Sequence, residues 1–478
     1  MEVFGSSGVR GVVGDLMTPA FVGRVARAAG TVWRERHDGP DRPVAALARD
    51  TRRTGETFAD AAAAGLTSVG LDVHRLGIVP IPGLQAYAER EGIPGLMVTA
   101  SHNPPEYNGV KLIGLDGIEL DRGDLERVEA HVRAMRSDGA IGPAHAPWDE
   151  TGRTRRVGDA RRRYIEGVLD AVDRRAIADA GLTVALDPGH GAGALTSPAL
   201  FRELGCDVVT VNATPDGHFP GRNPEPVPEN LHDLGRLVRA AGADVGIAHD
   251  GDADRAVFYD ATGEPVEGDA TLAALAAADL APGNATVSAV NVSQRLVDAA
   301  DRAGADLELT PIGSTHIITR IEELQAEGTH VPVAGEGNGG VLFPPYRLAR
   351  DGGYTAARLC ELLAGVGDIV GVDAGRRTVR EIVAPFDGYE NVRLNVGYGS
   401  DAEREAMLDA IGTHADESEA EVTTIDGYRL DFGDAWVLAR ESGTEPLVRV
   451  YAEAPSRERA EALAHAMRED IHGAMQEH

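Results

Sequence analysis

Short apolar runs alternate along the chain with alanine-rich segments whose apolar positions recur at helical spacing. In the first third of the chain, Pro43–Ala48 and Leu96–Thr99 are expected to be buried strands and Phe58–Gly70 a helix. The alternation resumes after a polar stretch at Gly139–Thr154, with expected helices at 161–172 and 197–204 and expected strands at 182–187 and 244–248. This order of elements is typical of α/β proteins, in which helices cover a sheet.

The same pattern continues in a third unit and then changes. The third unit runs from about Tyr259 to Gly371, and Val331–Ala334 is the strand expected before its glycine-rich loop. In the remaining chain we expect strands at 391–396, 421–424, 436–439 and 447–452, with helices at 401–414 and at the end. We therefore expect three related α/β domains with mixed sheets between helices, plus a smaller C-terminal α+β domain, at residues 1–150, 151–258, 259–372 and 373–478.

Composition limits the partners that this protein can have. The 478 residues include 76 acidic and 46 basic side chains, which give a formal net charge of −30 at pH 7. Such a chain repels nucleic acid and anionic membranes, so we expect neither as a partner. The acidic residues are spread along the chain and lysine is almost absent, which we interpret as adaptation to high salt, where self-repulsion is screened. Nothing in the composition predicts the oligomeric state.

The same features favour a cytoplasmic protein. Cys206 and Cys360 are too few for a disulfide framework or a thiolate metal site. The first residues show no basic segment followed by an apolar stretch, so no signal peptide is expected. The alanine-rich stretch Ala270–Ala281 is short and is interrupted by Asp279, so it is not expected to span a membrane.

Lys111 is the only lysine among the 46 basic residues, and it lies ten residues after Ser101 in the turn Thr99–Pro104. A lysine retained against such a bias is expected to do what arginine cannot. It could release a proton at an accessible pH, or it could fit as a compact ammonium group. Ser101 is a candidate nucleophile. The alternative is a lysine that persists by chance on a surface loop.

A second loop, Asp250-Gly-Asp-Ala-Asp-Arg255, places three carboxylates at alternate positions directly after an expected strand. Hard oxygen ligands at this spacing suit Mg²⁺ or a similar cation. A calcium-binding EF-hand loop starting at Asp250 would need glycine at its sixth position and glutamate at its twelfth, where this chain has Arg255 and Ala261. That alternative fails, and a plain acidic turn remains the other interpretation.

Two further loops carry polar groups suited to a sugar phosphate. Glu441–Pro446 lies between two expected strands and is flanked by Arg440 and Arg449. Its hydroxyls and successive backbone N–H groups could hold an anion, with the arginines binding phosphate, although an ordinary hairpin turn is the alternative. Gly335–Gly340 combines glycines with one carboxylate and one amide that could bind sugar hydroxyls, or it could be a structural turn.

Several other signals are weaker. Asp187–Gly193 lacks the spacing of a dinucleotide-binding loop, and no Walker-A motif surrounds the lysine. The histidines are scattered singly, which usually indicates structural roles. His102 adjoins Ser101 and is kept as a catalytic candidate, and His316 could line a cleft.

Together the loops predict phosphoryl transfer to and from a phosphorylated sugar, with the serine carrying the phosphoryl group. Because ligands bind beyond the carboxyl ends of strands, the four loops are expected to share one cleft. In this order, the loops at 99–104, 250–255, 335–340 and 440–446 resemble those of the α-D-phosphohexomutase family. Further matches are Phe4–Gly11, Arg49–Arg52 and Asp216–Pro224, and the resemblance covers essentially the whole chain.

The resemblance implies a heart-shaped molecule and a role for each motif residue. Ser101 would be the phosphoserine, and its phosphate would bind one Mg²⁺ together with Asp250, Asp252 and Asp254. The group in transfer would be surrounded by Arg10, Lys111 and Arg255. The substrate would be bound by Glu336 and Asn338 at its sugar hydroxyls, and at its non-reacting phosphate by Arg440, Ser442, Gly443, Thr444 and Arg449. A hexose 1,6-bisphosphate would be both intermediate and activator.

The activity implied is interconversion of hexose 6-phosphate and hexose 1-phosphate. Many bacterial members carry serine and a terminal histidine in the sugar loop, where this chain has Asn338 and Gly340. The loop resembles that of archaeal phosphoglucosamine mutases and phosphomannomutase/phosphoglucomutases. We expect glucosamine phosphate as the substrate, with a glucose and mannose phosphate mutase as the alternative. More distant alternatives are a metal-dependent sugar phosphatase and a non-catalytic sugar-phosphate sensor.

Overall fold

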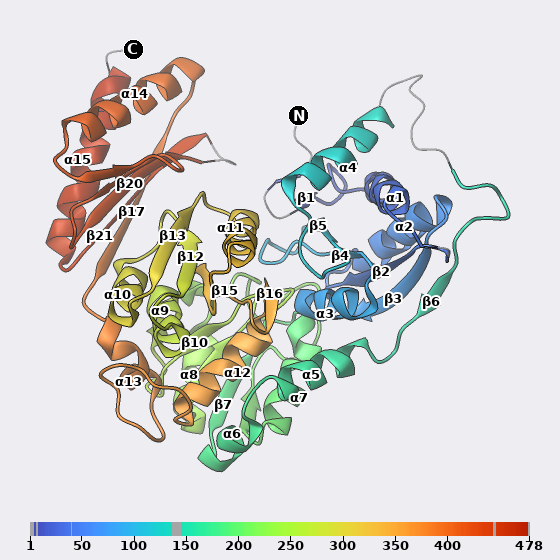
Figure 1. The fold of residues 1–478 in the computed structure, drawn as a ribbon, viewed down its shortest axis with the longest axis horizontal. Coiled ribbons are helices and arrows are strands. Elements are labelled where there is room, and N and C mark those ends of the chain that lie inside the picture. Colours follow the sequence, from blue (N-terminus) through green and yellow to red (C-terminus); the bar gives the residue numbers. More distant parts are fainter. Residues whose placement is uncertain (1–3, 6–7, 40, 136–144, 443–445, 477–478) are drawn as a thin grey trace. The chain divides into compact units, whose positions relative to one another are not determined.

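The computed structural model describes residues 4–5, 8–39, 41–135, 145–442 and 446–476 (Figure 1). The chain forms two compact units, one made of residues 1–271 with 338–382, the other of residues 272–337 with 383–478. None of the described helices is both long enough and apolar enough to cross a bilayer.

The first sheet of unit 1 is mixed, with strand order β1-β5-β4-β2-β3-β6. Strands β2, β3, β4 and β6 are parallel to one another, whereas β5 is antiparallel to both β4 and β1. The strands are β1 (Val9–Val12), β2 (Val44–Arg49), β3 (Asp72–Ile78), β4 (Gly95–Val98), β5 (Tyr107–Ile113) and β6 (Thr154–Arg156). β6 belongs to this sheet although it follows residue 150.

Helices cover both faces of this sheet. Alternate residues of a strand point to opposite sides, and in β2 both sets of residues are apolar. Ala45 and Leu47 of β2 pack in one core with the helices α1 (Pro19–Glu35), α2 (Gly55–Ser68) and α4 (Arg122–Ala134). Ala46 and Ala48 pack in another core, with α3 (Ile81–Glu91) and the start of α5 (Ala160–Asp170). The alanine-rich strand is therefore buried on both sides, which explains its continuous apolar sequence.

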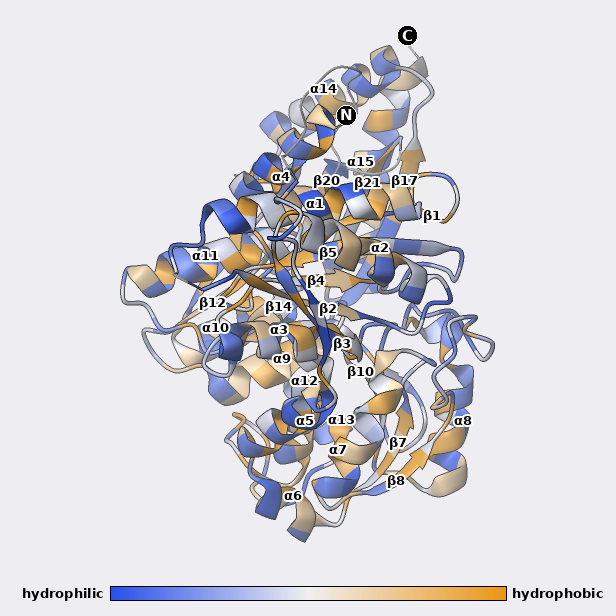
Figure 2. Cartoon of the chain, turned by 90° about the vertical axis from the view of Figure 1, so that its right-hand side faces the viewer, coloured by the Kyte–Doolittle hydropathy of each residue, from blue (hydrophilic) through white to orange (hydrophobic). Residues whose placement is uncertain are grey.

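The second sheet of unit 1 has strand order β11-β10-β9-β7-β8. β7 (Thr183–Asp187) is parallel to β8 (Asp207–Thr210) and to β9 (Val245–Ala248), and its central residues 184–186 are apolar (Figure 2). The other strands of this sheet are β10 (Val257–Tyr259) and β11 (Pro265–Val266). The helices in the same part of the chain are α6 (Arg174–Ala180), α7 (Ser197–Glu203) and α8 (His232–Ala241), with short 3-10 helices at 192–195 and 228–230.

Unit 1 also includes a hairpin and a helix from late in the chain. The hairpin pairs β15 (Gly340–Phe343) with β16 (Arg347–Arg350). Asp351 then caps α12 (Gly352–Leu363) by accepting a hydrogen bond from the Tyr354 amide. Two helices cross the limits of the units, namely α9 (Gly268–Asp279) and α13 (Val379–Val383).

Unit 2 contains a parallel pair of strands and an antiparallel sheet. The pair is β12 (Ala285–Ala289) and β13 (Asp306–Thr310), with α10 (Gln294–Ala303) and α11 (Ser314–Ala326). The C-terminal sheet has the order β17-β21-β20-β19-β18. Its elements are β17 (Glu390–Gly397), β18 (Glu421–Thr423), β19 (Tyr428–Asp431), β20 (Trp436–Glu441), β21 (Leu447–Ala454), α14 (Asp401–Glu417) and α15 (Arg457–Gln476), with a 3-10 helix at 384–386.

The expected α/β class is confirmed, and one expected strand lies at other residues. The strand expected at Val331–Ala334 is instead β14, Ala334–Glu336, because Pro332 has no N–H to donate to a ladder. No strand was expected at β19, where the polar Arg429 and Asp431 alternate with Tyr428 and Leu430.

Candidate active site

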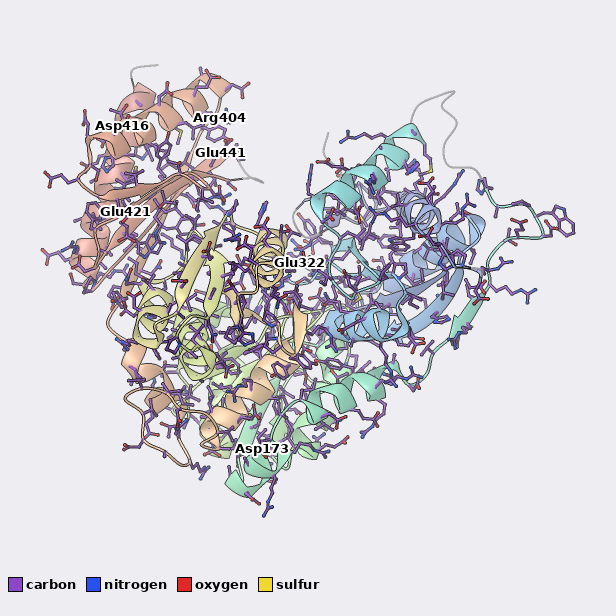
Figure 3. All side chains as sticks on the ribbon, viewed as in Figure 1. Asp173, Glu322, Arg404, Asp416, Glu421 and Glu441 are labelled. Atoms are coloured by element: carbon purple, nitrogen blue, oxygen red, sulfur yellow. The ribbon has the colours of Figure 1, made fainter. Side chains whose placement is uncertain are left out.

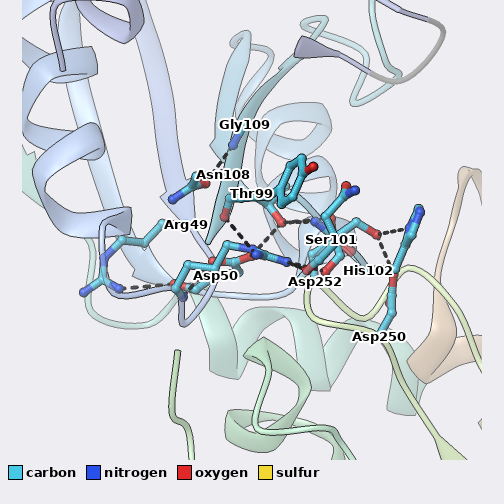
Figure 4. A network of polar contacts seen from close by, with 12 residues as sticks. Arg49, Asp50, Thr99, Ser101, His102, Asn108, Gly109, Asp250 and Asp252 are labelled. Atoms are coloured by element: carbon cyan, nitrogen blue, oxygen red, sulfur yellow. Dashed lines mark hydrogen bonds and ion pairs between the residues drawn. The ribbon is translucent and has the colours of Figure 1, made fainter. Parts of the chain in front are cut away.

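The Ser101 turn follows β4 directly and is held in an uncommon backbone conformation. Ser101 has φ +49°, and its side chain is buried. Its amide donates a hydrogen bond to Thr99 Oγ1 at 2.9 Å, and its Oγ donates to Asp250 Oδ2 at 2.6 Å (Figure 4). The structure thus places the predicted nucleophile in contact with the predicted metal loop.

Arg52, to which the sequence analysis gave no role, holds the whole serine turn. Its guanidinium is fully buried, and its Nε pairs with Asp50 Oδ2 at 3.1 Å. The other guanidinium nitrogens donate to four backbone carbonyls, those of Ser101, Asn103, Pro104 and Tyr107. Asp50 and Arg52 follow β2, the parallel neighbour of β4, and this adjacency was the available signal.

The loop after β9 brings its three carboxylates together. One oxygen from each of Asp250, Asp252 and Asp254 lies within 4.8 Å of the others. The loop also approaches the serine turn closely, since a Cβ added to Gly251 would lie 2.6 Å from the Ser101 carbonyl oxygen. Ala253 takes a positive φ of +55° to make the turn.

These carboxylates fit a hard divalent cation. Asp252 Oδ1 and Asp254 Oδ1 are buried and have no hydrogen-bond partner, an arrangement that is costly without a positive charge. Burial and the carboxylates of Asp254 and Asp252 raise the pKa of Asp250 well above its usual range. A cation at this point would relieve that repulsion and leave all three groups ionised.

Lys111 lies in β5 and is completely buried against acidic groups. Its Nζ is 3.3 Å from Asp254 Oδ2, 3.5 Å from Glu119 Oε1 and 3.6 Å from Asp252 Oδ2. Burial alone would lower the pKa of Lys111, but these carboxylates outweigh it and the pKa lies above the ordinary lysine value. Of the two roles left open by the sequence, this environment favours the compact ammonium over the proton donor.

Arg10 and His102 contact the serine turn. Arg10 in β1 donates to Asn103 Oδ1 at 3.4 Å, and His102 Nδ1 is 3.4 Å from Ser101 Oγ. Burial and the nearby Arg255 and Arg10 lower the pKa of His102 to about 2, so its ring is neutral. Arg255 is mostly buried, with Nε 3.9 Å from Asp254 Oδ1.

The loop at 335–340, which the sequence predicts to bind the sugar, crosses the limit of the two units between residues 337 and 338. In unit 2, β14 carries the half-buried Glu336, and the exposed His316 lies in the first turn of α11. Ser288 Oγ of β12 donates to the Gly335 carbonyl at 2.6 Å and fixes β14. In unit 1, the Gly340 amide donates to Asn338 Oδ1 at 3.0 Å.

The predicted phosphate-binding residues lie on the β20–β21 hairpin of unit 2. Arg440 and Arg449 are directly paired across the two strands, and the Ser442 amide donates to the Leu447 carbonyl at 2.9 Å. Glu441 pairs with Arg404 of α14 at 2.6 Å (Figure 3). Gly443 and Thr444 lie outside the described residues.

Asp426 is a second residue that the sequence analysis missed. Its Oδ1 accepts a hydrogen bond from Arg440 Nε at 3.0 Å. Its Oδ2 accepts one from the Ile312 amide, also at 3.0 Å, just before the loop that leads to His316. One carboxylate therefore holds an arginine of the hairpin against the start of another loop in the same unit.

An α/β scaffold with a strand-end serine against a buried carboxylate triad and a buried lysine defines a phosphoryl-transfer enzyme. The chain belongs to the phosphoglucomutase/phosphomannomutase family. The family's α/β/α domains I, II and III match residues 1–138, 162–263 and 267–386, and its C-terminal domain matches residues 391–470. The protein is therefore a phosphohexomutase, an isomerase that moves a phosphoryl group within its substrate.

Curated relatives and a solved structure support this assignment along the full chain. A phosphoglucomutase/phosphomannomutase of Thermococcus kodakarensis is 40% identical over 462 residues, covering 96% of each chain. A probable phosphoglucosamine mutase of Methanopyrus kandleri is 38% identical over 465 residues, covering 97% of this chain and 96% of the other. The crystal structure of a family member from Burkholderia thailandensis has a TM-score of 0.82 at 26% identity, covering 99% and 97% of the two chains.

Proposed function

We propose that this phosphohexomutase acts on glucosamine phosphate, interconverting its 6- and 1-phosphates. The choice of glucosamine phosphate rests on the sugar loop, which contains Glu336, Asn338 and Gly340. This loop offers one carboxylate and one amide to the polar groups of the sugar ring. The similar protein of Methanopyrus kandleri bears this activity in its name. A glucose and mannose phosphate mutase is the second candidate, supported by the name of the Thermococcus kodakarensis relative.

The reaction that we infer transfers a phosphoryl group twice. Phospho-Ser101 gives its phosphoryl group to the free hydroxyl of the bound hexose phosphate, so one P–O bond breaks at Oγ, another forms at the sugar oxygen, and the hydroxyl proton ends on the freed Oγ. The resulting bisphosphate turns over, and its other phosphoryl group returns to Ser101. The contact of 2.6 Å between Ser101 Oγ and Asp250 Oδ2 supports this role, because it holds the serine oxygen in one place between the two transfers.

Charged residues of unit 1 would stabilise the group in transfer. Asp250, Asp252 and Asp254, with the phosphate on Ser101, would hold Mg²⁺, which supplies positive charge to the phosphoryl oxygens. Lys111, Arg10 and Arg255 would provide fixed positive charge around the same group. His102 has a pKa of about 2 through burial and nearby Arg255 and Arg10, so we assign it an uncharged role at the serine.

The remaining residues would recognise the substrate. Glu336 and Asn338 would bind sugar hydroxyls, and His316 would lie near the same part of the ligand. The substrate binds in two orientations, and in both of them the same site must bind the phosphate that does not react. This site must therefore recognise phosphate rather than sugar. Arginines and backbone N–H groups meet that demand, and we assign it to Arg440, Ser442, Gly443, Thr444 and Arg449.

A substrate panel tests the proposed function. We expect the highest kcat/KM with glucosamine 6-phosphate when the purified protein is assayed with Mg²⁺ and each hexose 6-phosphate plus its 1,6-bisphosphate. A preference for glucose and mannose phosphates would favour the second candidate. Release of inorganic phosphate in step with substrate loss would instead indicate a sugar phosphatase.

Asp426→Asn tests the phosphate grip. The substitution keeps the shape of the side chain but weakens its hold on Arg440, so we expect the KM for the sugar phosphate to rise about tenfold with kcat little changed. Steady-state kinetics measure both constants. Asp434→Asn is the matched control, because Asp434 pairs with Arg459 at 2.8 Å on the surface of the same sheet and should leave both constants unchanged. A KM that responds equally in both variants would contradict the assignment.

A further inference from the structure

Arg350, at the end of β16, connects the sugar loop to the metal loop within unit 1. It is 8% exposed, and its Nη2 lies 2.7 Å from Asp254 Oδ2 and 4.0 Å from Glu119 Oε1. The hairpin that carries it begins at Gly340, and Arg350 lies opposite Leu342, two residues further along β15.

Position 340 has little room for a side chain. A Cβ at Gly340 would lie 2.8 Å from Arg350 Cδ and 3.0 Å from Asn338 Oδ1. Both distances are shorter than ordinary van der Waals contact. The stem of Arg350 cannot simply move aside, because its guanidinium is fixed by the ion pair with Asp254. A side chain at position 340 would therefore push the arginine off the carboxylate.

The ion pair between Arg350 and Asp254 also determines which carboxylate oxygen of Asp254 can bind a cation. Arg350 and Lys111 both lie on Oδ2, at 2.7 and 3.3 Å, while Oδ1 is buried without a hydrogen bond. Fixing one oxygen of a carboxylate leaves the other in a defined direction, as partners of metal ligands do in general. Glu119, which approaches both cations, balances the charge that they bring.

We propose that Arg350 is a positioning residue that couples the sugar loop to the metal-binding loop. Gly340 makes room for its stem, and its guanidinium orients Asp254 so that Oδ1 faces the cation. The proposal rests on the proposed function for the role of Asp254, but it does not depend on which hexose is the substrate. Gly340 and Arg350 form a matched pair, so a change in the sugar loop alters the metal site.

A double-mutant cycle tests this coupling by calorimetric titration of the metal-free protein with Mg²⁺ alone. Gly340→Ala should weaken Mg²⁺ binding about tenfold, although residue 340 has no side chain near the carboxylates. In an Arg350→Ala background, the same glycine substitution should change Mg²⁺ affinity less than about twofold. An equal effect in both backgrounds, or no effect in either, would overturn the proposal.

Arg350→Lys gives a second test that does not depend on the fold tolerating Gly340→Ala. Lysine keeps the charge but lacks the planar fork, so we expect kcat to fall about tenfold while the KM for sugar phosphate changes less than twofold. Arg347→Lys is the matched control, because Arg347 lies in the same strand but pairs with Glu89 at 2.9 Å. Equal kcat for Arg350→Lys and the wild type would overturn the positioning role. A different preferred hexose would refute the substrate assignment and leave this coupling intact.

Discussion

Ser101→Ala should abolish mutase activity, with a loss on the order of 10⁴-fold or more, because Ser101 is the residue that we propose carries the phosphoryl group between the two transfers. Intact-mass measurement gives a second readout. Wild-type protein incubated with the hexose bisphosphate should show a species heavier by one phosphoryl group, and the variant should not. Arg52 holds the turn through four backbone carbonyls, so the fold should survive removal of the hydroxyl.

Ser68→Ala is the control for this prediction. Ser68 lies at the end of α2, where its Oγ donates to the Gly65 carbonyl at 2.7 Å, far from the carboxylate triad in the chain. Its removal should change neither the rate nor the phosphorylated mass. If the Ser101→Ala protein still acquires the phosphoryl group, the carrier is another residue and the proposed reaction is wrong.

Lys111→Arg should lower kcat by about 10²–10³-fold, even though the substitution preserves the positive charge. The ammonium group fits among Asp254, Glu119 and Asp252 in a fully buried space. The backbone of Gly8 packs closely against the aliphatic part of Lys111, since a Cβ added to Gly8 would lie 3.1 Å from Lys111 Cγ. The wider planar guanidinium would displace one of these carboxylates, two of which we assign to the metal site.

The pH dependence separates the two roles of this lysine. Burial opposes the charged form, but the carboxylates outweigh it and raise the pKa of Lys111, so the ammonium persists as the pH rises toward the usual lysine value of about 10.4. The kcat of the wild type should therefore show no limb from Lys111 between about pH 6 and pH 9. A limb in this range that disappears in Lys111→Arg would indicate proton transfer. Near-normal kcat in the variant would show that the site tolerates either cation.

The strands that carry the site could be predicted because they are continuous apolar runs. The runs at 96–99 and 244–248 correspond to β4 and β9, whose burial on both faces demands such sequences. The serine turn and the aspartate loop were recognisable because their functional residues are contiguous and follow these strands directly. A functional loop can be recognised from local sequence when its functional residues are contiguous in the chain.

Residues that act through distant partners could not be found this way. Arg52 binds carbonyls about fifty positions along the chain, and Asp426 binds an amide 114 positions away. Each appears in the sequence as one more charged residue in a highly charged chain. The reason for Gly340 is likewise invisible, because the atom that excludes its side chain belongs to Arg350. Only the fold brings such pairs into contact.

The close approach of Gly251 to the Ser101 carbonyl has a consequence for how the protein folds. Ser101 and Asp250 are 149 positions apart and follow strands of two different sheets. We expect this contact to form late in folding, because contacts of such long range carry a large loop-closure cost. During synthesis, the nascent chain can complete most of the first sheet before the aspartate loop has been made. A polypeptide released at that stage would display the serine turn without its acidic partner, so the contact between Ser101 and Asp250 would form only after the aspartate loop has been made.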